Sequence, residues 1–171
     1  MTHEAFGSRA LARLLEAHEA SVVETHARHG DATALVALAD VVPVLRFLRD
    51  DDACAFAMLV DLCAVDYLGF TGDAHEALGR FEVVYHLLAP ATLQRVRVKA
   101  RVPAHPAEIA STTGLWPAAN RMEREVFDLY GIRFTGHPDL RRLLLYDGFD
   151  GHPLRKDYPK TRRQPLIGPS H

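Results

Sequence analysis

Two histidines in the last third of the chain stand in the same local pattern, Gly136-His137-Pro138 and Gly151-His152-Pro153. Proline restricts the residue before it to extended geometry, and glycine permits a close approach of the backbone. Such a pair could bind a metal ion or act as bases, because imidazole titrates near neutral pH. No third ligand accompanies them at a recognisable spacing. We therefore expect both histidines to make structural hydrogen bonds.

Only two cysteines, Cys54 and Cys63, occur in the 171 residues. An iron–sulfur cluster is typically held by four thiolates, and a closed zinc site needs cysteines or histidines at short, paired spacings. The two thiols are instead nine residues apart, in a stretch with the apolar character of a buried strand. We expect both to be small core residues, with no cofactor and no metal bound by this chain.

The acidic residues of the sequence do not form a pair suited to acid–base catalysis. Glu123 and Glu125 stand two apart on an expected helix, so their side chains diverge. We expect them to lie on an ion-paired helix surface, and Arg124 to pair with Asp128 four residues on. The glycine-rich, P-loop, zinc-protease and serine-hydrolase motifs are absent, which disfavours nucleotide binding and hydrolysis. No catalytic residue is predicted.

Charge is divided unevenly along the chain. Residues 1–79 carry 5 basic and 13 acidic side chains, a net charge of −8, whereas residues 80–171 carry 15 and 9, a net charge of +6. A basic half could meet nucleic acid, anionic lipid or an acidic protein surface. One expected strand, Gln94 to Val102, alternates apolar residues with four cations, Arg95, Arg97, Lys99 and Arg101, which predicts a cationic exposed strand face.

Hydrophobic periodicity indicates the elements that position these residues. Helices are expected from Ser8 to Ala17, from Asp40 to Asp50 and from Pro117 to Gly131, and strands over Ser21 to Ala27, Thr33 to Leu38, Phe56 to Val65, Phe81 to Leu88 and Gln94 to Val102. Their order, α-β-β-α-β-β-β-α, predicts an α+β fold in two layers. The helices would cover one face of a mixed or antiparallel sheet of about five strands.

The remainder, residues 135–171, is rich in proline and glycine and poor in apolar residues. It cannot form a core of its own, so it should lie against the domain or another subunit; we expect residues 1–134 to form the α+β domain and residues 135–171 an extended tail that packs on a partner subunit. The composition, 48% hydrophobic and 25% charged, is that of a globular protein. Without a recognisable secretory signal or membrane-spanning run, we expect a soluble, intracellular, reduced protein.

Three blocks carry a family resemblance: Glu123 to Ile132, Gly136 to Arg142, and Gly151 to Pro159. Together they resemble the signature of the C subunit of NADH-quinone oxidoreductase, a hydrophilic peripheral-arm subunit family of respiratory complex I. Val65-Asp66, the Val83-Val84-Tyr85 strand and the segment from Trp116 to Asn120 are similar too, so most of the chain is covered.

The resemblance implies a structural subunit without a redox cofactor, in a proton-translocating complex whose FMN and Fe–S clusters lie in partner subunits. Its implied partners are the quinone-site subunit (the 49 kDa-type or D subunit) and other peripheral-arm subunits, with no nucleic acid. It implies a peripheral position on the cytoplasmic side of the inner membrane, reached through the complex. Expected interface residues are Glu123, Arg124, Glu125, Asp128, His137, Pro138, Arg141, Arg142, His152, Pro153, Leu154, Arg155, Lys156, Asp157 and Tyr158.

Within the tail, we expect Arg141, Arg142, Arg155 and Lys156 to pair with carboxylates of the partner. Three alternatives stay open from the sequence. The chain could be the equivalent subunit of a related complex, such as a membrane-bound hydrogenase or a ferredoxin- or F420-linked dehydrogenase. It could be a nucleic-acid-binding module that uses the basic strand and tail. It could also be a metal enzyme that uses His137 and His152.

Overall fold

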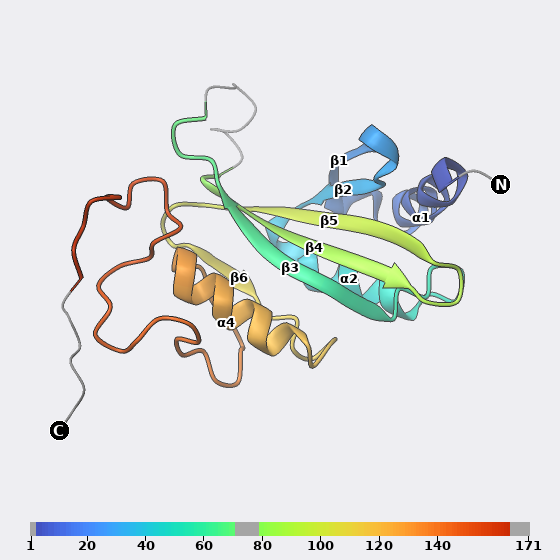
Figure 1. The fold of residues 1–171 in the computed structure, drawn as a ribbon. Helices are drawn as coiled ribbons and strands as arrows, with labels where there is room; N and C mark the ends of the chain where they lie inside the picture. Colours follow the sequence, from blue (N-terminus) through green and yellow to red (C-terminus); the bar gives the residue numbers. More distant parts are fainter. Residues whose placement is uncertain (1–2, 71–78, 165–171) are drawn as a thin grey trace.

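The computed structural model describes residues 3–70 and 79–164, and these form an α+β domain followed by a long loop region (Figure 1). The expected tail end, 165–171, and part of the expected loop, 71–78, lie outside the described residues. The helices and strands are α1 His3–His18, β1 Val22–His26, β2 Thr33–Val36, α2 Val41–Asp50, β3 Met58–Asp66, β4 Phe81–Ala89, β5 Gln94–Val102, β6 Glu108–Ala110, α4 Ala119–Tyr130 and β7 Arg133–Thr135.

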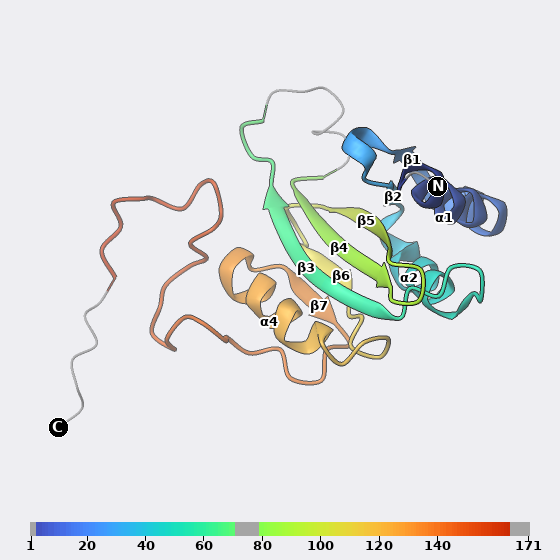
Figure 2. The same ribbon diagram turned by 45° about the vertical axis from the view of Figure 1, so that its right-hand side comes forward.

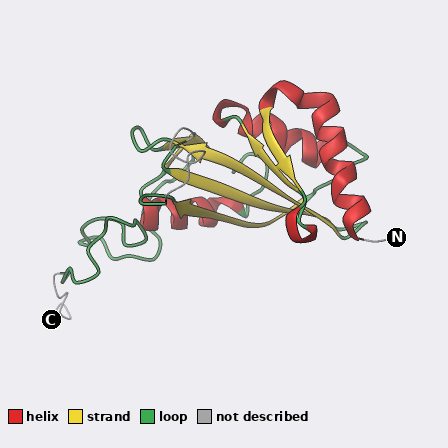
Figure 3. Ribbon diagram, turned by 90° about the horizontal axis from the view of Figure 1, so that it is seen from above, coloured by secondary structure: helices red, strands yellow, loops and turns green. Residues whose placement is uncertain are grey.

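Five strands make one mixed sheet in the order β1-β2-β5-β4-β3. The β1–β2, β4–β5 and β3–β4 pairs are antiparallel, and the two predicted hairpins join through a parallel pairing of β2 with β5. The predicted fold class and the predicted element order are therefore confirmed. Seen from above, the sheet is a twisted layer, and the C-terminal loops leave it at the end away from the N-terminus (Figure 3).

The hydrophobic core lies on one face of this sheet. Alternate residues of β4, such as Val83 and Tyr85, point into it and are fully buried. Helices α1, α2 and α4 bury Leu14, Leu48 and Val126 in the same cluster. The helical faces predicted by periodicity are thus the ones that meet the sheet.

The other face of the sheet, which we call the open face, departs from the predicted cationic surface. Glu82 is 3% exposed and forms ion pairs with Lys99 Nζ at 2.9 Å and Arg101 Nε at 3.0 Å. Arg97 forms an ion pair with Asp31 at 2.9 Å. The prediction of an exposed face with four cations was wrong because β4 places Glu82 directly opposite Arg101, a pairing that the strand's own alternation does not reveal.

Smaller departures concern short elements and helix starts. Helix α1 begins at His3, so Ser8 lies inside the helix and is not its N-cap. Asp40 precedes α2 as expected but makes no side-chain capping bond. The parallel pair β6–β7 was not predicted, because each strand is only three residues long. Over the described ranges, no helix combines the length and apolarity needed to cross a membrane.

A cavity between helix α2 and the sheet should lower the stability of the domain. Leu48 of α2 is fully buried, and we expect Leu48→Ala to lower the free energy of unfolding by about 3 kcal/mol. Leu93, 69% exposed in the β4–β5 turn, is the matched control, and Leu93→Ala should change it by about 0.5 kcal/mol or less. Chemical denaturation of both variants measures the difference. Equal losses would contradict the assigned core.

Candidate subunit interface

Helix α4 carries the first of the motif blocks and ends where the C-terminal tail meets it. The tail is here the described part of the chain after β7, residues 136–164. Gly131 adopts the left-handed conformation, with φ 72°, and its N–H donates to Phe127 O at 2.8 Å. This is the helix ending predicted from the sequence, since glycine adopts positive φ without a Cβ penalty. The chain then turns through buried Ile132 into β7.

Asp128, near the end of α4, anchors the start of the tail. Its carboxylate is fully buried and accepts the backbone N–H groups of Leu143, Leu144 and Leu145 at 2.8–3.0 Å. Arg142 Nη1 donates to the second carboxylate oxygen at 2.9 Å. Burial acts to raise the pKa of Asp128, but these donors outweigh it and hold the pKa below the ordinary 3.8. The carboxylate therefore stays ionised and fully bonded.

Three successive carbonyl groups at the C-terminal end of α4 accept donors from the tail. His152 Nδ1 lies 2.8 Å from Asp128 O, Leu154 N donates to Leu129 O at 3.1 Å, and Arg155 Nε donates to Tyr130 O. A helix end leaves such carbonyls without intrahelical partners, and its partial negative charge favours a cation. Burial lowers the pKa of His152, which fits a neutral ring carrying its proton on Nδ1.

A second buried carboxylate holds the tail against the end of β3. Arg80 donates to both oxygens of Asp66, at 3.0 and 2.7 Å, and also to both oxygens of Asp157, at 2.9 and 2.8 Å. The backbone N–H of Lys156 adds a bond to Asp66 at 2.9 Å. Burial opposes ionisation of Asp66, but Arg80 and the backbone donors keep its pKa below the ordinary value. The last motif block is thus fixed by one arginine shared between two aspartates.

The remaining α4 residues of the expected interface differ in their surroundings. Glu123 is fully buried, so its predicted place on an ion-paired surface was wrong. It accepts bonds from Ser111 Oγ and from both the N–H and hydroxyl of Thr112, at 2.6–2.7 Å, while burial raises its pKa. Glu125 is exposed. The spacing of Arg124 and Asp128 predicted an ion pair between them, and this was wrong. Arg124 instead donates to two carbonyl groups of the tail, Arg141 O and Arg142 O.

The two Gly-His-Pro histidines make separate structural hydrogen bonds, as expected. His137 Nε2 is 3.2 Å from Asn120 O, and its Nδ1 accepts the N–H of Asp139. His152 bonds to α4 as described above. Among the described residues, neither histidine belongs to a group of three side chains that could hold a metal ion. Of the prolines that follow them, Pro138 is exposed and Pro153 is partly buried.

The expected pairing of four tail cations with a partner stays a prediction, and the structure shows which of the four already have contacts within the chain. Arg142 and Arg155 already have partners within the chain, and Arg155 also lies over the Phe81 ring at 5.3 Å. Arg141 has a side chain 74% exposed, beside Asp139, and Lys156 is exposed. Only Arg141 and Lys156 of the four therefore point their charge outward.

Apolar side chains of the tail also face outward, and sequence reasoning missed most of them. The exposed fraction is 60% for Leu144, 48% for Leu154, and 36% for both Leu143 and Tyr146. Tyr158 is turned inward and stacks on Phe149 at 6.1 Å. The signal in the sequence was the run Leu143-Leu144-Leu145 inside a segment too poor in apolar residues to bury it.

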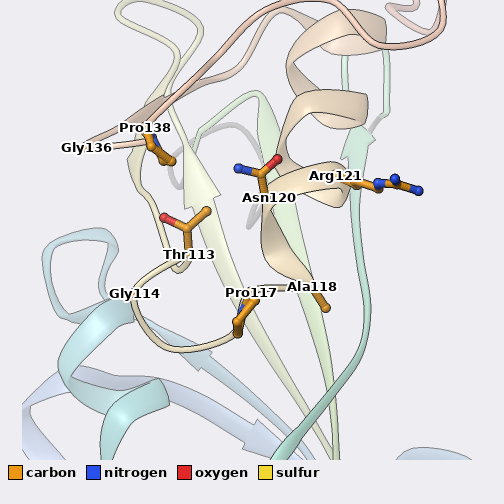
Figure 4. Close-up of a pocket in the computed structure, with 8 residues that line it drawn as sticks. All are labelled: Thr113, Gly114, Pro117, Ala118, Asn120, Arg121, Gly136 and Pro138. Atoms are coloured by element: carbon orange, nitrogen blue, oxygen red, sulfur yellow. The ribbon is translucent and has the colours of Figure 1, made fainter.

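A shallow, open pocket of about 870 Å³ lies beside the start of α4 (Figure 4). Its walls are Thr113, Gly114, Pro117, Ala118, Asn120, Arg121, Gly136 and Pro138. Asn120 is directed toward Thr113 and Pro138, whereas Arg121 points away from them (Figure 4). Its walls hold no carboxylate, histidine or cysteine, the side chains most used in acid–base chemistry.

Comparison with known families decides the identity of the fold and its motif blocks. Residues 34–164 match the family described as respiratory-chain NADH dehydrogenase, 30 Kd subunit. The chain belongs to this family. The match spans most of the sheet, α4 and the whole described tail, so the anchoring contacts above lie within the region that defines the 30 Kd-subunit family.

Relatives of the 30 Kd-subunit family agree with this match. The chain is 51% identical over 132 residues to the C subunit of NADH-quinone oxidoreductase from Hyphomonas neptunium, covering 77% of this chain and 61% of the relative. It is 44% identical over 148 residues to the C 1 subunit of the same enzyme from Rhizobium meliloti, covering 86% and 70%. The chain thus spans about three fifths of the length of the Hyphomonas relative.

Solved structures extend the comparison for this member of the 30 Kd-subunit family. The trypsin-resistant fragment (1-134) of Nqo5 aligns with a TM-score of 0.66 and 31% identity, covering 77% of this chain and 99% of the fragment. A chain of the membrane-bound sulfane sulfur reductase, an archaeal respiratory membrane complex, aligns with a TM-score of 0.70 and 24% identity, covering 91% and 86%. The second likeness shows the shared fold alone.

Neutralising Asp128 should loosen the tail. We expect Asp128→Asn to lower the free energy of unfolding at pH 7 by about 3 kcal/mol, because a buried charge pair loses one partner. Since the folded pKa of Asp128 lies below 3.8, its stabilisation is present above pH 4 and is lost as the pH falls through the folded pKa. Unfolding titrations from pH 7 to pH 2 should show a shallower acid decline for the variant. Asp139→Asn, with a side chain 52% exposed, is the control and should leave both quantities unchanged.

A side chain at Gly131 should separate the tail from α4. A Cβ there would lie 2.5 Å from His152 Nε2 and 2.6 Å from Arg155 Nη2. Gly136 has a similar φ, 82°, but nothing within 4 Å of its Cβ position, so Gly136→Ala reports the backbone strain alone, about 1 kcal/mol. We expect Gly131→Ala to cost several times more and to speed trypsin cleavage after Arg141 and Lys156. Equal cleavage rates in both variants would contradict the packing of the tail on α4.

Proposed function

We propose that this chain is a structural and assembly subunit of a proton-translocating NADH-quinone oxidoreductase. In this proposal it supports the quinone-site subunit, of the 49 kDa type, and the electron-transfer arm, while FMN and Fe–S centres in other subunits carry electrons from NADH to quinone. Support comes from family membership and from relatives named as the C subunit of that enzyme. The two cysteines are too few for the four thiolates of a typical iron–sulfur cluster.

One observation carries the proposal: polar contacts anchor the tail, while several of its large apolar side chains remain exposed. Its inner contacts are charges and backbone groups bonded to Asp128, Asp66 and the end of α4. Leu144, Leu154 and Tyr146 are exposed in the same segment as exposed charged residues such as Arg141 and Lys156. Exposed large apolar side chains are typical of a surface that a partner protein covers.

The position of the tail favours contact with a neighbouring subunit. Most of the tail loops out beyond the end of α4, to the side of the domain (Figure 2). The contacts that fix the second and third motif blocks reduce the conformational entropy that the tail would lose when a partner binds it. We propose that the exposed side of the tail, together with the pocket at the start of α4, docks on the quinone-site subunit.

This arrangement distinguishes two groups among the expected interface residues. Asp128, Arg142, His152, Arg155 and Asp157 position the tail through contacts within the chain. The direct contacts are proposed for Arg141, Lys156, Leu154, Pro138 and the newly found Leu143, Leu144 and Tyr146. Membrane association would then be indirect, through the complex, on the cytoplasmic side of the inner membrane.

A charge at Leu144 should weaken assembly without unfolding the chain. Leu144 is 60% exposed and anchors the tail only through its backbone, so Leu144→Glu should leave the free energy of unfolding within about 0.5 kcal/mol. A buried, unpaired carboxylate in the interface should cost at least about 2 kcal/mol, a loss of roughly 30-fold in affinity. Co-purification of the quinone-site subunit and NADH–quinone activity of membranes measure the effect.

The matched control is Leu93→Glu, which adds the same charge at a leucine 69% exposed in the β4–β5 turn. It should retain the quinone-site subunit and activity at the level of the unchanged protein. If Leu144→Glu retains them equally well, the tail is not the docking surface and the proposal fails.

A further inference from the structure

The open face of the sheet brings together three side chains that commonly bind metals. Asp61 and Cys63 lie on β3, and His86 lies on β4 directly opposite Asp61. One ligand atom from each lies within 4.8 Å of the other two. They form the single such group within residues 3–70 and 79–164. Asp61 is exposed, and the other two are partly buried.

A β-bulge between Leu59 and Asp61 creates this grouping. Before the bulge Leu59 points into the core, whereas after it the core positions are Leu62 and Ala64. The extra residue therefore shifts the alternation by one and turns Asp61 and Cys63 to the open face. Cys63 was expected to be a core residue like Cys54, and for Cys63 this was wrong for the same reason.

We propose that Asp61, Cys63 and His86 bind a Zn²⁺ ion. Thiolate, imidazole and carboxylate are its usual ligands, and thiolate with imidazole disfavours Mg²⁺ and Ca²⁺. Ligand atoms on a tetrahedral Zn²⁺ lie about 3.5 Å apart, given bonds of about 2.0–2.3 Å. The three ligand atoms now lie within 4.8 Å of one another, so side-chain rotation must bring them closer for Zn²⁺ to bind. Three protein ligands leave the fourth position to water.

The local charges are compatible with this ion. Arg97 lies opposite His86 on β5, but its guanidinium is paired with Asp31 at 2.9 Å. Zn²⁺ binds the thiolate form of Cys63, so binding releases the thiol proton to the solvent as the Zn–S bond forms.

Cobalt and zinc titrations of the full 171-residue chain without an affinity tag test this proposal. Co²⁺ should bind with one equivalent and give a thiolate-to-cobalt charge-transfer band in the near ultraviolet, and one equivalent of Zn²⁺ should abolish it. Cys63→Ala should lose the band. Cys54→Ala is the matched control and should keep it, since Cys54 is 4% exposed in the core.

Two further variants keep the test decisive if Cys63→Ala does not fold. Asp61→Asn and His86→Gln alter side chains on the open face, and each should weaken Zn²⁺ binding at least tenfold while circular dichroism stays unchanged. A wild-type chain without the charge-transfer band would overturn the proposal. So would a band that survives in Cys63→Ala, or Zn²⁺ affinities of Asp61→Asn and His86→Gln equal to that of the unchanged chain.

Discussion

The buried carboxylate of Asp128 is the constraint on which the rest of the tail depends. A carboxylate removed from water is costly unless its oxygens are fully bonded, and α4 itself offers it no cation. The donors come from residues 142–145, which must lie across the helix to reach it. Asp66 imposes the same condition at the end of β3, where Arg80 and the Lys156 N–H supply the donors. Two buried charges thus fix a segment that has almost no apolar core.

This way of anchoring explains why the tail leaves four large apolar side chains exposed. A loop normally buries its leucines and exposes its charges, but here the inner side must satisfy carboxylates and the carbonyl groups at the end of α4. Backbone N–H groups of Leu143, Leu144 and Leu145 face inward, so two of their side chains are left largely exposed. The arrangement leaves apolar area unburied in the isolated chain, and under the proposed docking a partner surface would bury it.

Local patterns in the sequence were sufficient to locate the longer elements and insufficient to predict their contacts. Alternation and turn signals located both hairpins, and Gly131 located the end of α4, because these depend on neighbouring residues. The predicted Arg124–Asp128 pair failed because a residue fourteen positions away, Arg142, binds the same carboxylate. Cys63 was misplaced because a bulge changes the phase of a strand without changing its composition. Such errors arise wherever a distant segment or a single inserted residue decides which way a side chain points.

The shifted carboxyl groups of this chain bear on whether it could be a catalyst. Perturbed pKa values often mark active sites, but a catalytic acid or base must keep an oxygen available to a substrate. Asp128, Asp66 and Glu123 each accept three or more hydrogen bonds within the chain, and all three are buried. None of them faces the pocket beside α4, whose walls carry no acid or base. The lowered pKa values of Asp128 and Asp66 follow from the donors that hold the tail, and the raised pKa of Glu123 follows from its burial, so none of the three shifts needs a catalytic role to explain it.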